Sequence, residues 1–178
     1  MFELSRERLE QLRDQLRARG QRPSLVMAGP RTSQEIVETA MIAEQWGPFV
    51  EAMYLMMAAD RRVLEVEREV LRGALSVLSG DSVRTRHMES MLDSAARKLA
   101  EAGEDKCLQH VLTALADDPA KAETTVVIAA AIAAADNRFV PEEHALLQKL
   151  IKGLGIDAAH GSEIVAELEA ALKTPQKA

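Results

Sequence analysis

The sequence contains a single cysteine, Cys107, which excludes an intramolecular disulfide and argues against a cysteine-ligated zinc site. This cysteine usage favours a reducing compartment, so we expect a cytoplasmic protein. The first 19 residues are charged throughout and lack the apolar core of a signal peptide. The longest apolar run, Val126–Ala135, is about half of the ~20 residues that a membrane-spanning helix needs, so we expect no direct membrane insertion.

Aromatic residues, glycine and proline are also scarce. Aromatics make up 3% of the chain against 47% hydrophobic residues, with nine glycines and six prolines. The apolar mass is therefore alanine, leucine, valine, isoleucine and methionine, and alanine and leucine are the strongest helix formers. No alternating strand pattern of useful length is present. The composition predicts an all-α protein, and 178 residues are enough to bury a core without metal or disulfide staples.

The sequence has no basic excess and none of the common catalytic motifs. Its net charge is −6, with 22 basic residues interspersed among 28 acidic ones. A duplex-binding domain usually has a basic stripe, so we expect no nucleic-acid partner. The arginines near the start, Arg13, Arg17 and Arg19, alternate with acidic residues and are typical of a solvated helix face. Glycine-rich phosphate loops, a serine-nucleophile motif and a zinc-protease motif are absent, so we expect no enzyme activity.

Spacing of apolar residues divides the chain into an arm and a domain. Leu9, Leu12 and Leu16 predict an amphipathic helix over residues 3–19. Residues 20–32 contain two glycines and two prolines and predict a linker more mobile than the core. We expect 1–32 to be an amphipathic helix with its linker, 33–173 a helical domain that folds without this arm, and 174–178 a flexible tail. The predicted helices of the domain are 33–46, 48–59, 65–78, 82–101, 104–116, 120–135, 141–153 and 160–172.

An internal repeat is the most informative feature of the sequence. The segment MAADRRVLEVE, which contains Asp60, aligns with AAADNRFVPEE, which contains Asp136 and lies 76 residues later. After both segments, apolar residues recur at equivalent positions of the two copies. Each copy reads as a small-residue helix, an Asp turn and an amphipathic helix. We therefore expect a multi-helix bundle with two repeated helix–Asp-turn–helix units, related by a pseudo-two-fold axis, with the alanine-rich helices at its centre.

The repeated turn is the candidate functional site. In each copy an aspartate at the turn precedes a glutamate in the first turn of the next helix by seven residues. Four carboxylates across the two copies could hold a hard cation such as Ca²⁺ or Mg²⁺, and a second glutamate near each helix start could add to them. An EF-hand is excluded because Arg62 and Leu64 stand where its loop needs oxygen ligands. The candidate metal ligands are Asp136, Glu143, Glu142, Asp60, Glu67 and Glu65.

A purely structural interpretation of the same residues stays open. A glutamate at the third helical position can accept the amide hydrogen of the N-cap residue, and the aspartates can accept turn amides or pair with arginines. If a cation binds, we expect it to prefer the second turn. The reason is electrostatic, because Arg61 and Arg62 follow Asp60 whereas neutral Asn137 follows Asp136.

The two segments Met57–Glu67 and Ala133–Glu143 resemble the TerB-like tellurite-resistance family, a fold also found in the N-terminal region of membrane-anchored DnaJ-like co-chaperones. The family pattern is Ala-Ala-Asp-Gly, an aliphatic residue and a Ser/Thr-x-x-Glu helix start, given twice. Arg61 and Asn137 replace the glycine here, and Leu64 and Val140 replace the capping Ser/Thr. By layout the resemblance covers residues 36–172. It implies an all-helical module that binds divalent ions and works in stress-related or membrane-associated protein complexes.

These observations lead to one functional expectation and two alternatives. We expect a non-enzymatic TerB-like module that acts through protein contacts and a divalent cation; a homo-oligomer is compatible with the sequence. The first alternative is an ion-independent adaptor or scaffold, docking through the N-terminal amphipathic helix or the Met53–Met57 region. The second is an enzyme with a metal at the acidic turns, and the sequence disfavours it because His144 is the only base near them.

Overall fold

The computed structural model describes residues 6–21 and 32–172, which form eight helices and no strand. The predicted all-α class is confirmed. Most of the predicted linker and the whole predicted tail lie outside the described residues. None of the described helices is both long and apolar enough to span a membrane. The helices are α1 (Arg6–Gly20), α2 (Ser33–Ala58), α3 (Glu65–Leu78), α4 (Thr85–Ala102), α5 (Glu104–Leu115), α6 (Pro119–Ala133), α7 (Pro141–Gly153) and α8 (Ala158–Leu172).

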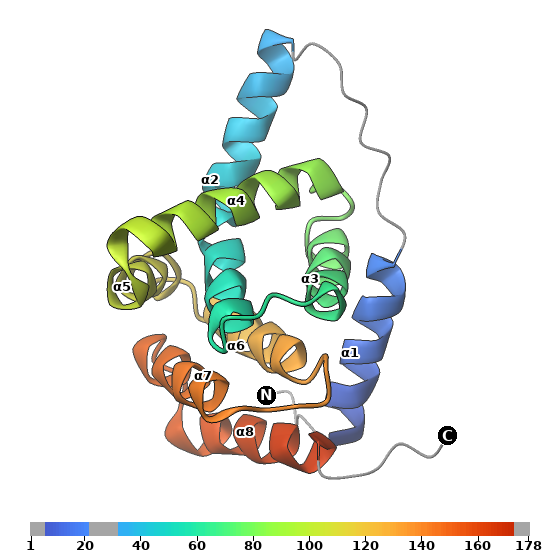
Figure 1. Ribbon diagram of the computed structural model, residues 1–178, viewed down its shortest axis with the longest axis vertical. Coiled ribbons are helices and arrows are strands. Elements are labelled where there is room, and N and C mark those ends of the chain that lie inside the picture. The colour runs from blue at the N-terminus through green and yellow to red at the C-terminus, as the bar shows by residue number, and fades with distance from the viewer. Residues whose placement is uncertain (1–5, 22–31, 173–178) are drawn as a thin grey trace.

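Helices α2 and α6 form the centre of the bundle (Figure 1). Helices α4 and α5 pack on α2, α7 and α8 pack on α6, and α3 packs against both central helices. The C-terminal half of α6 is almost entirely buried, and its side chains there are mainly alanines such as Ala130 and Ala131. Alanine allows neighbouring helices to approach closely, which explains why the most alanine-rich segment became the centre.

Helix α2 is longer than the sequence predicted. We expected Gly47-Pro48 to separate two helices, and this was wrong, because α2 runs through both residues. An interior proline costs a helix about 3 kcal/mol through a lost hydrogen bond and a steric clash. Full burial of one large apolar side chain stabilises the fold by ~1.5–3 kcal/mol. Phe49, Val50 and Met53 are all buried soon after the proline. Packing of the second half of α2 therefore outweighs the local break.

Local capping and turn residues set several helix ends. Thr32 and Glu35 form a capping box at the start of α2, with reciprocal hydrogen bonds of 3.2 and 3.1 Å. Helices α3 and α7 have the predicted bounds. Helix α4 begins three residues later than predicted, because Gly80 and Asp81 take positive φ values of 58° and 64° and the chain needs a longer turn.

Helix α1 packs into the same core as the domain. Its Leu9 and Leu16 are buried, and α1 contacts α3, α6 and α8. The crossing with α3 is so close that a Cβ atom added to Gly73 would lie 1.8 Å from the carbonyl oxygen of Leu16. Arg17 and Glu69 add an ion pair of 2.8 Å across the crossing. This packing argues against our expectation that the domain folds without residues 1–32, which a truncation experiment decides.

Candidate carboxylate site at the two Asp turns

Each Asp turn is closed by a hydrogen bond from the chain to the aspartate. Oδ1 of Asp60, which follows α2, accepts the backbone N–H of Arg62 at 2.8 Å. Oδ1 of Asp136, which follows α6, accepts the backbone N–H of Arg138 at 2.9 Å. These are the turn amides that the structural interpretation assigned to the aspartates. Neither arginine side chain pairs with its aspartate among the ion pairs of the described residues.

The residue after each aspartate lies in the left-handed region of the backbone. Arg61 has a φ of 63° and Asn137 a φ of 60°. The N–H of Arg61 is 2.9 Å from the carbonyl oxygen of Ala58, and the N–H of Asn137 is 3.3 Å from that of Ala134. The left-handed region costs most side chains about 1–2 kcal/mol, although asparagine tolerates it better. The first turn therefore carries backbone strain at Arg61, at the position where the TerB-like pattern has glycine.

Glu67 and Glu143, the glutamates seven residues after each aspartate, cap the following helices. Oε2 of Glu67 accepts the N–H of Leu64 at 2.7 Å, and Oε2 of Glu143 accepts the N–H of Val140 at 3.0 Å. Both glutamates are buried, with exposed fractions of 3% and 6%. The predicted capping role is therefore confirmed for both. Each cap uses one carboxylate oxygen and leaves the other to make a further interaction.

Burial and mutual repulsion change the acidity of both glutamates. Loss of solvation raises the pKa of Glu67 from 4.5 to about 8, against the opposing effect of the Leu64 N–H, and the charges of Glu143, Asp136 and Asp60 raise it further. Carboxylates from the two turns therefore act on one another, although the turns are far apart in the sequence. We call Asp60, Glu67, Asp136 and Glu143 the four-carboxylate group.

Glu143 responds to the same surroundings. Burial raises its pKa from 4.5 to about 7, opposed by the hydrogen bond from Val140. The charges of Asp136 and Asp60 raise the pKa further, while the nearby Arg138 lowers it. The group thus holds two buried glutamates that favour a bound proton near neutral pH, and two aspartates that oppose their ionisation.

Two of the six predicted ligands lie outside this group. Glu65 is exposed and pairs with Arg72 at 3.2 Å, and Glu142 is exposed in the first turn of α7. The ring of His144 packs edge-on against Phe139, with 5.5 Å between centroids. Within residues 6–21 and 32–172, no three histidine, cysteine or acidic side chains have the geometry to hold a metal ion as they stand.

Arg13 of α1 is a contact of the second Asp turn that the sequence analysis missed. We interpreted it as part of a solvated helix face, but it is buried. Its Nη1 donates to the carbonyl oxygen of Ala134 at 3.3 Å and to Oδ1 of Asn137 at 3.1 Å. Its spacing is the signal that could have found it, because it lies four residues after Leu9 and three before Leu16. Arg13 ties α1 to the second Asp turn.

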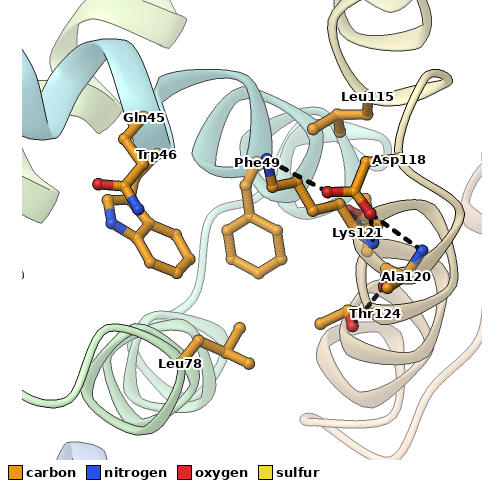
Figure 2. A pocket seen from close by; sticks show the side chains of 10 residues that line it. Gln45, Trp46, Phe49, Leu78, Leu115, Asp118, Ala120, Lys121 and Thr124 are labelled. Carbon is orange, nitrogen blue, oxygen red and sulfur yellow. Dashed lines mark hydrogen bonds and ion pairs between the residues drawn. The ribbon is translucent and has the colours of Figure 1, made fainter.

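A separate apolar pocket of about 210 Å³ opens at the other end of α6 (Figure 2). Trp46 and Phe49 of α2 form its aromatic wall, with ring centroids 6.2 Å apart and an interplanar angle of 84°. Leu78 faces them from α3, and Lys121 lies at the side of α6, 3.4 Å from the Asp118 carboxylate. The pocket lies at the start of α6 whereas Asp136 follows its end, so the pocket and the four-carboxylate group are distinct features.

Comparison with known proteins identifies the family. The family model of tellurite resistance protein TerB matches residues 49–164. The match begins inside α2, contains both Asp turns and ends inside α8, so it leaves out α1 and the first half of α2. No curated protein and no solved structure matches the chain significantly. Because the matched segment is well over half of the 178 residues, the chain belongs to the TerB tellurite-resistance family.

Proposed function

We propose that this protein is a non-enzymatic TerB-family module that holds a divalent cation, Ca²⁺ or Mg²⁺, at the four-carboxylate group and acts through protein contacts. The observation that supports the cation is the burial of Glu67 and Glu143 within electrostatic reach of Asp60 and Asp136, which raises the pKa of both glutamates. The resemblance to TerB-like proteins supplies the wider setting, a stress-related or membrane-associated complex.

The physical reason is that clustered carboxylates need a counter-charge. At neutral pH the group lowers its repulsion either by keeping a proton or by binding a cation, and hard divalent cations prefer carboxylate oxygens. The turn and cap hydrogen bonds use one oxygen of each member. Binding then draws the remaining oxygens of both turns toward one ion while the caps persist. Because this closure has a conformational cost, we expect modest affinity.

The second candidate is the ion-independent adaptor or scaffold. It is favoured by the fact that every member of the group already has a structural hydrogen bond. The docking regions that we expected for it are not accessible, since Met53, Met56 and Met57 are fully buried and the apolar face of α1 lies in the core. An adaptor must therefore use a different surface.

Thermal unfolding and calorimetric titration separate the two candidates. The protein is stripped with EDTA and titrated with Ca²⁺ or Mg²⁺, alongside Asp60→Asn and Asp136→Asn, which keep the turn acceptor but remove the charge. Asp157→Asn is the matched control, because Asp157 accepts the Ala159 N–H at 2.9 Å at the start of α8, outside the group. A cation at 100 times its Kd should stabilise the wild type and the control by ~2.7 kcal/mol.

The two turn variants should lose most of this stabilisation. We expect Asp136→Asn to weaken binding more than Asp60→Asn, because Arg61 and Arg62 follow Asp60 in the chain. The reverse order would contradict that electrostatic argument. Absence of any cation effect on the wild type would rule out the ion and leave the adaptor.

A further inference from the structure

The first half of α2, residues 33–46, extends beyond α4 and away from the bundle (Figure 1). Three large apolar side chains on this extension are exposed: Ile36 by 55%, Val37 by 58% and Met41 by 64%. They are the three most exposed large hydrophobic residues in the described part of the chain. An exposed apolar patch on a soluble protein commonly marks an interaction site.

The exposed residues share one side of the helix. Val37 and Met41 are one turn apart, as are Ile36 and Ala40, so the four residues form a continuous strip that we call the α2 stripe. The other side of the extension is already covered: Ile42 packs on the core, and Glu35 lies 3.8 Å from Arg86 of α4. The stripe thus belongs to a helix that is anchored along one side and exposed along the other.

The charges around the stripe define what can cover it. Residues 32–47 contain no lysine or arginine. Glu38 precedes Met41 by three residues and Glu44 follows it by three, and neither forms an ion pair among those of the described residues. On its own helix the stripe is therefore an aliphatic surface bordered by acidic residues, while the nearby basic residues Arg86, Arg97 and Lys98 belong to α4.

We infer that the α2 stripe docks a basic amphipathic helix of a partner protein, with aliphatic residues along one face and lysine or arginine beside them. A second copy of this chain would place Glu38 and Glu44 against the same residues, and an anionic membrane surface would repel them as well. The family match begins at residue 49, so the stripe lies outside the TerB segment. A helix pair of this size belongs with small, transient interfaces, for which micromolar affinity is typical.

A designed peptide tests the inference directly. The probe is a fluorescein-labelled model helix of about four turns, with leucines on one face and lysines on the other. The control peptide has glutamates in place of the lysines. Fluorescence anisotropy should show micromolar binding of the lysine peptide. Val37→Ser/Met41→Ser should weaken it at least tenfold. Val77→Ser should not, although Val77 is 53% exposed on α3. Glu38→Gln/Glu44→Gln should weaken binding and reduce its dependence on salt.

Several results would overturn the proposal. Unchanged binding by Val37→Ser/Met41→Ser would place the peptide elsewhere, and equal binding of the glutamate peptide would refute the charge argument. Sedimentation that shows a wild-type dimer lost in that double variant would identify a second copy as the occupant. Binding to phosphatidylglycerol vesicles through the same residues would identify a membrane. The substituted side chains are exposed, so circular dichroism should show unchanged folding.

The inference rests on the protein contacts of the proposed function and not on its cation. The binding assay is therefore run in EDTA and repeated with Ca²⁺. Peptide binding that depends on the α2 stripe in both conditions supports the surface whatever the outcome of the cation titration. Peptide binding that is indifferent to the stripe refutes this surface while leaving the cation proposal to its own test.

Discussion

Glu67→Gln removes one charge from the four-carboxylate group and keeps the helix cap, because the amide oxygen can accept the Leu64 N–H that the carboxylate now accepts. In the folded protein, burial and the neighbouring carboxylates raise the pKa of Glu67 from 4.5 to about 8. Glutamine has no proton to lose. The variant should therefore be more stable than the wild type at high pH, even though the substitution removes a carboxylate that caps a helix.

The direction with pH follows from proton linkage. Below pH 4.5 Glu67 is protonated in both the folded and the unfolded chain, and the shift has no effect on stability. Between pH 4.5 and about 8 the unfolded chain loses the proton while the folded protein keeps it. The free energy of unfolding of the wild type therefore falls as pH rises through this window and levels off above it.

The size of the effect has a ceiling set by the shift itself. At about 1.4 kcal/mol for each pH unit between the two values, the ceiling is roughly 5 kcal/mol. Part of the shift depends on the charges of neighbouring carboxylates, and water and salt screen charges at the turn, so only part of the ceiling is expressed. We expect Glu67→Gln to be more stable than the wild type by about 2 kcal/mol above pH 8.

Urea unfolding at pH 6, 7, 8 and 9 in EDTA measures this directly. The wild type should lose stability across the series, and Glu67→Gln should show a clearly smaller slope. Glu65→Gln is the matched control, since Glu65 belongs to the same helix start but is exposed and pairs with Arg72. It should keep the wild-type slope. If Glu67→Gln is less stable than the wild type by the same amount at every pH, the pKa of Glu67 is not raised in the folded protein and the reasoning fails.

Three further predictions concern the backbone and the arm. Arg61→Gly should stabilise the protein by about 0.5–1 kcal/mol in urea unfolding, because relief of the left-handed backbone exceeds the entropy that glycine adds to the unfolded chain; a loss of stability would refute this. Gly73→Ala should destabilise by ~1–3 kcal/mol through a clash with the Leu16 carbonyl, whereas Gly47→Ala, with open space around it, should be neutral or stabilising. Deletion of residues 1–32 should abolish or broaden cooperative thermal unfolding, and an unchanged transition would restore our original expectation of a separable arm.

The local structure of the site could be predicted from the sequence because it depends on neighbouring residues. The seven-residue spacing from Asp60 to Glu67 places the aspartate at a turn and the glutamate at the third position of the next helix, and both form the hydrogen bonds expected there. The second copy at Asp136 and Glu143 has matching bonds. Superposition of the whole units remains a prediction.

The parts that the sequence did not predict depend on tertiary contacts. Pro48 is a strong helix breaker by itself, and only the burial of the residues after it shows why α2 continues. Arg13 has the composition of a surface residue, and its burial follows from the docking of α1 on α3 and α6. Glu65 is exposed whereas Glu67 is buried, because the packing of α3 on the bundle decides which of its faces is covered. Spacing singled out Glu67 as the main partner of Asp60, but only the folded structure shows that the additional candidate Glu65 lies outside the group.

The aromatic wall of the pocket at the start of α6 also makes the protein easy to follow by spectroscopy. Trp46 is the only tryptophan in the chain, and it lies where α2, α3 and α6 meet. Its fluorescence therefore reports on one defined junction between the central helices. The junction is remote from the Asp turns, which follow the C-terminal ends of α2 and α6, so a change in Trp46 emission on adding a cation reveals a rearrangement transmitted along these helices. An unchanged emission together with a raised melting temperature would instead indicate a response confined to the turns.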